Sequence, residues 1–201
     1  MISGRTQGRY DDMHPESIQE WVVRRIVLYE LMSLDGVAEE PGNWMCEVDD
    51  AVVGNLAAII ARQDAVLLGR RTYDYWSGYW PTSDVQPFAD FINGTTKHVF
   101  TSTEPPDVWA HSVFVDEPMV EYVRQLRSVT GGDIGVHGSI TLAQGLLEAD
   151  LVDELALVVA PALAAGGRKL FEARHELRRL ELRDVDRATT GAVFLHYART
   201  R

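Results

Sequence analysis

Short runs of apolar residues, separated by polar or glycine-containing segments, dominate the pattern along the chain. Long continuous runs predict strands that are buried on both faces over residues 25–33, 65–69 and 154–160. Shorter runs predict three more strands over residues 97–101, 112–115 and 133–137. Because these runs recur between stretches of helical spacing, the pattern is typical of a sheet whose strands alternate with helices.

Apolar residues that recur every three or four positions predict the helices. This spacing covers residues 48–62, 84–91, 118–128 and 139–148. Asp49 and Asp50 lie in the first turn of the first helix, where negative charge suits the helix dipole. We expect Asn93-Gly94 to stop the second helix and Ser139 to cap the last one. The aromatic stretch 72–81 shows no clear period and is expected to be irregular.

The carboxyl-terminal region completes the predicted fold. Residues 180–182 and 193–197 alternate between apolar and polar on either side of Thr189-Thr190-Gly191, which predicts an antiparallel hairpin. We therefore expect an α/β protein with a three-layer α/β/α fold. Its mainly parallel mixed sheet would gain the C-terminal hairpin as an antiparallel edge.

The amino-terminal residues lack this regularity. Residues 1–23 mix charged residues, glycine and proline without periodicity, so we expect a flexible extension. A capping pattern also favours a short helix over residues 17–23. Residues 24–201 are then expected to form a single domain.

Composition limits the classes of protein that fit. The 201 residues suit one domain, and 46% hydrophobic with 24% charged residues is usual for a globular protein. No run reaches the roughly 18 apolar residues of a membrane helix, and no signal-peptide pattern opens the chain. Cys46 is the single cysteine, which excludes an internal disulfide. We therefore expect a cytoplasmic protein with no membrane partner.

The net charge of −11 restricts what the chain can bind. Most of such a surface repels the phosphates of nucleic acid, and no basic stripe interrupts it, so no nucleic-acid partner is expected. An anionic cofactor could bind only where local cations or backbone N–H groups overcome this field. Arginines that cluster at a strand end are therefore informative.

Arg70 and Arg71 form such a cluster after the predicted strand 65–69. Ligands of open α/β sheets bind at the carboxyl ends of strands, where Gly69 permits close backbone approach. The two guanidinium groups suit phosphate, and Thr72 adds a hydroxyl and an N–H that would face an anion at a helix start. The alternative is that both arginines pair with acidic residues on the surface, and spacing alone leaves the two readings equal.

A second turn of this kind follows the predicted strand 133–137. Here His137 leads into Gly138, Ser139 and Ile140 at the start of a helix, so a pyrophosphate could bind to backbone N–H groups alone. An ordinary strand-to-helix turn with a serine cap explains the same residues and is favoured when this motif is taken by itself.

Carboxylates and an aromatic residue follow the first predicted strand. Asp35-Gly36 is first a turn signal, but a flexible segment here could cover a bound ring. Trp44 is followed by Asp49 and Asp50, and a carboxylate near an aromatic residue could accept a hydrogen bond from a ring N–H or transfer a proton. Helix capping is the strong alternative for both aspartates.

Several other chemistries lack a signal. The six histidines show no metal-ligand spacing, so no metal is expected. The sequence also lacks a Gly-x-Ser-x-Gly elbow, a Walker-type Gly-Lys-Ser/Thr and the Rossmann glycine fingerprint.

The order and spacing of the motifs carry a family resemblance. Its carriers are the segments 33–36, 41–44, 69–73, 99–102, 138–139, 151–154 and 166–171. In this order they resemble the dihydrofolate-reductase-like superfamily. More closely, the chain is similar to stand-alone bacterial proteins that resemble the reductase (C-terminal) domain of bifunctional riboflavin-biosynthesis deaminase-reductases. The resemblance covers about residues 25–199.

The resemblance implies NADPH as hydride donor and, by analogy, a homodimer. The segments it assigns to the cofactor are 69–72 for its phosphates, 138–140 for the pyrophosphate, 101–102 for the adenosine side and 36–38 for the nicotinamide. The implied cofactor-binding residues are Gly36, Val37, Ala38, Gly69, Arg70, Arg71, Thr72, Thr101, Ser102, Gly138, Ser139 and Ile140. On the substrate side it implies Trp44 as a binding residue, with Asp49, Asp50 and Asp35 as candidate catalytic residues.

The substrate side departs from both relatives. Dihydrofolate reductases carry a ring-binding carboxylate a few residues after a tryptophan, but residues 45–48 do not match that pattern. Riboflavin-pathway reductases hold a ribose phosphate near the Asp-Gly loop, where Glu39 and Glu40 would here repel it. We therefore expect an NADPH-dependent reductase of a small planar heterocyclic or carbonyl substrate. A non-catalytic nucleotide-binding or partner-binding protein is the alternative, and a flavin or other nucleotide in the same cleft stays open.

Overall fold

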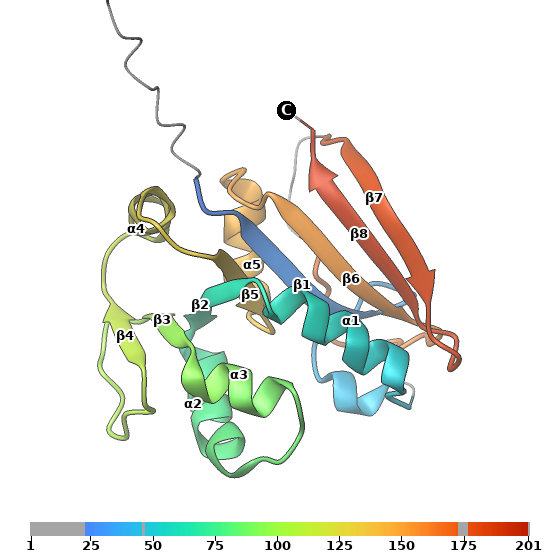
Figure 1. The fold of residues 1–201 in the computed structure, drawn as a ribbon, viewed down its shortest axis with the longest axis horizontal. Helices are drawn as coiled ribbons and strands as arrows, with labels where there is room; N and C mark the ends of the chain where they lie inside the picture. The colour runs from blue at the N-terminus through green and yellow to red at the C-terminus, as the bar shows by residue number, and fades with distance from the viewer. Residues whose placement is uncertain (1–22, 46, 173–176, 201) are drawn as a thin grey trace, which may run out of the picture.

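A computed structural model describes residues 23–45, 47–172 and 177–200 of the chain. The expected amino-terminal extension, its short helix and Cys46 lie outside this part, apart from Val23. The described residues form a mixed sheet with helices on both faces, shown as a ribbon in Figure 1.

The sheet has eight strands in the order β4-β3-β2-β5-β1-β6-β8-β7. The strands are β1 (Ile26–Ser33), β2 (Gln63–Gly69), β3 (Thr96–Phe100), β4 (Ser112–Val115), β5 (Asp133–His137), β6 (Glu154–Ala160), β7 (Leu180–Arg187) and β8 (Val193–Arg199). The strands from β4 to β6 in this order pair in parallel, while β8 pairs antiparallel with β6 and β7 antiparallel with β8. The predicted strands, the terminal hairpin and the mixed α/β sheet are thus confirmed.

In the described part of the chain, five α-helices cover the sheet. They are α1 (Asp50–Ile60), α2 (Arg70–Tyr79), α3 (Phe88–Gly94), α4 (Met119–Ser128) and α5 (Ile140–Glu148), with short 3-10 helices η1 (Pro41–Asn43) and η2 (Trp80–Thr82). One apolar cluster joins α4 and α5 to β1 and β5, and two others join α1, α2 and α3 to the opposite face. Because side chains alternate along a strand, β1 contributes Leu28 to the first cluster and Val27 to the second.

The expectation of an irregular segment over 72–81 is wrong. Residues 70–79 form α2, which η2 continues. Tyr73, Trp76 and Trp80 recur at helical spacing, and Tyr73 is fully buried. The ring of Trp76 lies 5.5 Å from that of Phe88 and 5.9 Å from that of Trp80. Tyr73, Trp76 and Trp80 therefore form the inward face of this helical segment, while Tyr75 and Tyr79 are exposed.

Two of the predicted helices also have different boundaries in the structure. The second helix begins at Phe88, four residues later than expected, because Pro87 disfavours helical geometry at the residue before it. It continues through Asn93 and ends at Gly94 instead of stopping before them. The first helix begins at Asp50, since Asp49 has extended backbone and caps it.

Ion pairs connect the amino-terminal ends of the central strands. Arg25 contacts Asp133 at 2.8 Å and Glu154 at 2.6 Å, and Arg62 contacts Glu154 at 3.2 Å. His196 of β8 adds a contact to Glu154 at 3.0 Å. This network joins the starts of β1, β2, β5 and β6 at the edge opposite the predicted ligand-binding turns.

Candidate functional site

The turns predicted to bind a cofactor lie at the carboxyl edge of the sheet. β2 ends at Gly69, β5 at His137 and β1 at Ser33, and these strands are direct neighbours or share β5 as a neighbour. Because they run in parallel, their following turns meet at one edge. Thr101 and Ser102 follow β3, the next strand along.

Two of these turns touch each other. The backbone N–H of Gly69 donates to the hydroxyl of Ser139 at 3.0 Å. The hydroxyl of Thr72 donates to the carbonyl of Gly138 at 3.2 Å. Ser139 occupies the N-cap position of α5 as predicted, but its hydroxyl makes no cap bond to its own helix. The Ser139 hydroxyl oxygen instead accepts the N–H of Gly69, which precedes α2, so the N-termini of α5 and α2 lie side by side.

Gly138 is required in this turn for two reasons. Its φ of +62° lies in the left-handed region that favours glycine. A Cβ atom there would also stand 2.9 Å from the ring of Trp76. The close approach of this turn to α2 therefore depends on the absence of a side chain.

The two predicted phosphate-binding arginines differ in their surroundings. Arg70 donates to Asp74 at 2.7 Å and to the carbonyl of Thr103 at 2.6 Å, with a longer bond to the Thr101 hydroxyl at 3.3 Å. It therefore braces the segment after β3. The side chain of Arg71 is 78% exposed and forms an ion pair with Glu39 at 3.2 Å. Arg71 is thus the freer of the two cations.

The segment 36–38 is held firmly against the rest of the edge. Gly36 has a φ of +90°, and the hydroxyl of Ser33 accepts the N–H of Val37 at 2.9 Å. Val37 and Ala38 are both buried, and Val37 forms a β-bridge with Lys169. Val37 and Ala38, both predicted beside a nicotinamide, are thus packed into the protein, and Gly36 is the partly exposed residue of this segment.

Asp35 anchors this loop. Its carboxylate accepts the hydroxyl of Ser33 at 2.7 Å and the backbone N–H groups of Ala164 and Ala165 at 2.9 and 3.2 Å. These hydrogen bonds, led by that from Ser33, lower the pKa of Asp35. An ionised carboxylate with these partners joins two loops and is not a proton donor at neutral pH.

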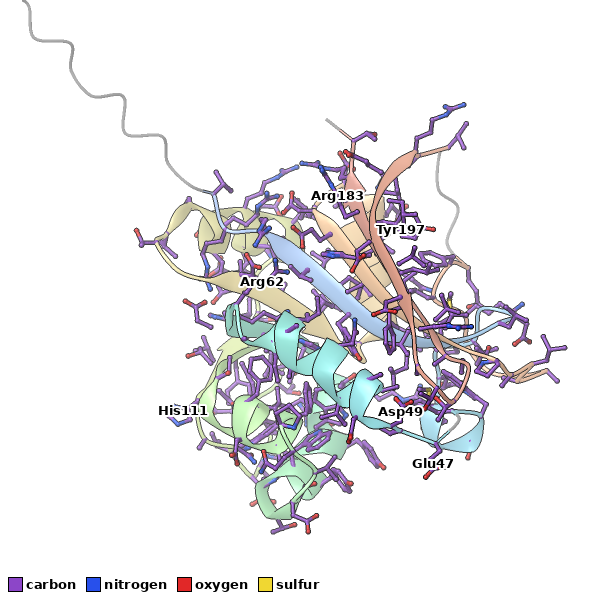
Figure 2. All side chains as sticks on the ribbon, turned by 45° about the vertical axis from the view of Figure 1, so that its right-hand side comes forward. Glu47, Asp49, Arg62, His111, Arg183 and Tyr197 are labelled. Carbon is purple, nitrogen blue, oxygen red and sulfur yellow. The ribbon has the colours of Figure 1, made fainter. Side chains whose placement is uncertain are left out.

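Asp49 and Asp50 lie at the start of α1. Asp49 accepts the N–H of Val52 at 3.1 Å, and it accepts the N–H and hydroxyl of Thr189 at 2.9 and 2.6 Å. The hydroxyl bond from Thr189 is the main cause that lowers the pKa of Asp49. Asp50 is exposed. Figure 2 shows Asp49 at one end of α1 and Arg62 near the other. Its hydrogen bonds show a structural role for Asp49, which caps α1 and binds the β7–β8 turn through Thr189.

Trp44 lies beside a surface hollow of about 440 Å³. Its indole N–H donates to the carbonyl of Glu39 at 2.8 Å. The hollow is lined by Glu39, Glu40, Asn43, Trp44, Ala162, Leu163, Ala164, Gly166 and Gly167. Two carboxylates and an aromatic residue thus share one concavity with the loop after β6.

Glu30 is a residue that the sequence analysis missed. It lies in β1 with only 4% exposure, and its Oε2 has no hydrogen-bond partner among the described residues. Burial raises the pKa of Glu30 to about 8, although backbone N–H groups of Leu31 and Gly138 donate toward the carboxylate and oppose the shift. Its position could have been noticed in the sequence, because Glu30 is the single acidic residue within the apolar run 25–33.

His137, beside the Gly138 turn, is a core residue. Its Nε2 lies 2.8 Å from the side-chain oxygen of Gln63, and its ring packs against those of Tyr29 and Phe88. Burial lowers the pKa of His137 to about 3, so the ring stays neutral at physiological pH. This environment favours the structural interpretation of the histidine.

Comparison with known proteins identifies relatives by sequence. A family model described as the RibD C-terminal domain matches residues 24–194. YyaP of Bacillus subtilis (strain 168), itself described as uncharacterized, is 25% identical over 181 residues, covering 87% of this chain and 94% of YyaP.

Solved structures share the fold. A candidate riboflavin biosynthesis protein from Shewanella sp. PV-4 superposes with a TM-score of 0.72 at 19% identity, covering 88% of this chain and 99% of that one. A pyrimidine reductase-like protein from Corynebacterium diphtheriae gives 0.65 at 16% identity, covering 89% and 92%. The deaminase/5-amino-6-(5-phosphoribosylamino)uracil reductase of Thermotoga maritima gives 0.64 at 14% identity, covering 89% of this chain and 57% of its own.

Within residues 23–45, 47–172 and 177–200, no helix is long and apolar enough to cross a membrane. Among the same residues, no group of three or more histidine, cysteine, aspartate or glutamate side chains is placed to hold a metal ion.

Proposed function

The chain belongs to the RibD C-terminal domain family, and on this premise we propose that it is an NADPH-dependent reductase of a small planar heterocyclic or carbonyl substrate. The family and its structural neighbours support a reductase-like function. The observation that carries the proposal for this chain is the contact between the Gly69–Thr72 and Gly138–Ser139 turns. It places two helix N-termini together at the carboxyl edge of the sheet.

This arrangement fits the phosphates of a dinucleotide. The first N–H groups of α2 and α5 lack partners within their helices and, with the helix dipoles, favour an anion. Arg71 adds an exposed guanidinium, whose planar fork suits phosphate oxygens. Together they provide the local positive potential that a chain of net charge −11 needs to bind an anionic cofactor.

The remaining residues would orient the reactants. Bound NADPH would supply the hydride. The segment 36–38, fixed by Ser33 and Lys169, would face the ring through the partly exposed Gly36 and exclude water from one side. Asp35 and Asp49 would support the site by holding its loop and helix, since hydrogen bonds already occupy both carboxylates.

The hollow beside Trp44 is the proposed substrate site. Its indole ring suits a flat substrate, and the lining glutamates disfavour a phosphate. We therefore propose a substrate without the phosphoribosyl group that the name of the Thermotoga relative includes.

A nucleotide-binding protein without turnover is the second candidate. It is favoured by the lowered pKa values of Asp35 and Asp49, because neither carboxylate would carry a proton for a substrate at neutral pH. Tight NADPH binding, with no turnover of a broad panel of planar imines and carbonyl compounds, would support this candidate.

Titration with NADPH and NADH, followed by fluorescence, tests the cofactor proposal. We expect Arg71→Ala to weaken NADPH binding about tenfold or more, because one charge-assisted phosphate contact is worth about 1.5–3 kcal/mol. Arg124→Ala is the matched control, since Arg124 is exposed on α4. No binding of either dinucleotide at millimolar concentration would refute the proposal.

A further inference from the structure

Glu39 lies between the proposed cofactor site and the proposed substrate hollow. One carboxylate oxygen pairs with Arg71 at the start of α2, at 3.2 Å. The other accepts the backbone N–H of Arg168 at 3.2 Å. The same residue lines the hollow beside Trp44. A single carboxylate therefore contacts a guanidinium assigned to phosphate while forming part of the substrate wall.

The ion pair between Glu39 and Arg71 is exchangeable. The side chains are 25% and 78% exposed, so water screens their attraction. The contact is made through one nitrogen of Arg71, whereas a phosphate can accept two parallel bonds from a guanidinium. A phosphate that approaches the start of α2 would thus displace the carboxylate from Arg71.

Glu39 itself would stay in place after that exchange. Its backbone N–H donates to the carbonyl of Arg168 at 3.3 Å, and its carbonyl accepts the indole N–H of Trp44 at 2.8 Å. Its second carboxylate oxygen keeps the Arg168 N–H. Loss of Arg71 would therefore leave an ionised carboxylate, with its compensating cation removed, at the wall of the hollow.

We propose that Glu39 couples the two ends of the site, so that an anion bound to Arg71 frees its carboxylate for a positively charged or N–H-donating group in the hollow. This inference rests on the proposed function and names the substrate class: a planar compound with an amidine-like or amine-like group beside the ring. Binding is then cooperative in both directions, because a cation on Glu39 also releases Arg71 for phosphate.

Benzamidine, a flat cation, and benzamide, its neutral counterpart, are suitable probes. Their dissociation constants would be measured by calorimetry with and without saturating NADPH. We expect NADPH to tighten benzamidine binding about two- to fivefold, the range that an exposed ion pair provides. Benzamide affinity should not change.

Three variants isolate the coupling. Arg71→Ala should strengthen benzamidine binding without NADPH by the same two- to fivefold, because Glu39 is then always free, and NADPH should add no more. Glu39→Gln should weaken benzamidine binding and abolish the NADPH effect. Glu40→Gln is the matched control, because this exposed neighbour lines the same hollow but has no ion pair to Arg71 in the described structure. Glu40→Gln should lower benzamidine affinity but leave unchanged the ratio of the benzamidine dissociation constants with and without NADPH.

The two proposals fail in different ways. If NADPH does not bind, the reductase proposal fails, and the effect of Arg71→Ala on benzamidine alone still tests the masking of Glu39. If NADPH binds but benzamidine affinity is unchanged both by NADPH and by Arg71→Ala, the coupling is overturned and the cofactor proposal stands. If NADPH tightens benzamidine binding by the same factor in Glu40→Gln as in the native protein, the specific role of Glu39 is supported. If that NADPH effect is lost in Glu40→Gln, the specific role of Glu39 is overturned.

Discussion

Replacing Glu30 with glutamine should remove a pH dependence from the stability of the protein. Glu30 lies in the middle of a buried strand, and burial raises its pKa from 4.5 to about 8. The native state therefore holds a proton that the unfolded chain has released over this pH range. The Glu30 contribution to stability is largest below pH 4.5 and is lost as the pH rises through about 8.

The magnitude follows from the same pKa change. Each unit corresponds to about 1.4 kcal/mol, so the wild-type free energy of unfolding should fall by up to about 5 kcal/mol across the range. Glutamine keeps a carbonyl that can accept the N–H of Gly138 or Leu31 but does not titrate. The variant should therefore lack this component and become the more stable protein toward pH 8.

Urea unfolding followed by tryptophan fluorescence, between pH 5 and pH 8.5, measures the difference. Other titrating groups, such as His98 with its lowered pKa, contribute equally to both proteins and cancel. Glu40→Gln serves as a control for the loss of an exposed carboxylate. Parallel stability curves for wild type and Glu30→Gln would refute the assignment of a neutral buried acid.

Three further predictions concern the turn, the helix cap and the sheet edge. Gly138→Ala should destabilise the fold by about 1–3 kcal/mol in thermal unfolding, because its φ is +62° and the new Cβ meets Trp76; an unchanged melting temperature would contradict the required close approach. Asp49→Ala should cost about 1 kcal/mol by removing the cap of α1, while Asp50→Ala should cost less in the same assay. The strand β7 is exposed along its whole length, so we predict a homodimer that includes this edge; Leu182→Lys should shift the mass measured by light scattering toward the monomer, and a native monomer would dismiss the idea.

The layered fold was predictable because its signals are local. The apolar run of β6 marks a strand buried on both faces, and six of its seven residues are indeed buried. The expectation of an irregular segment over 72–81 is wrong because it rests on aromatic composition, whereas the spacing of three and four residues places Tyr73, Trp76 and Trp80 on one helix face. Helix starts depended on backbone geometry at Asp49 and Pro87.

The candidate site could be predicted from the sequence only in part, for a different reason. The rule for parallel sheets places the turns after β2 and β5 at one edge. Their direct contact depends on the strand order, in which β2 and β5 are neighbours, and the sequence pattern does not show that order. Which side chains remain available to a ligand depends on tertiary partners. Spacing could not show that Arg70 would brace Thr103 while Arg71 stays exposed. Nor could it show that the Ser139 hydroxyl would reach across to Gly69.

The ion-pair network at the amino-terminal edge has a consequence for how this scaffold can diversify. Arg25, Arg62, Asp133 and Glu154 join four strands at the end far from the proposed ligand-binding turns. These ion pairs hold the starts of the strands in alignment without contacting the loops at the other end. Those loops can be lengthened, shortened or recharged to change substrate while strand register is preserved. An engineer seeking a new specificity should graft the segments 36–45 and 161–170 and leave the opposite end untouched.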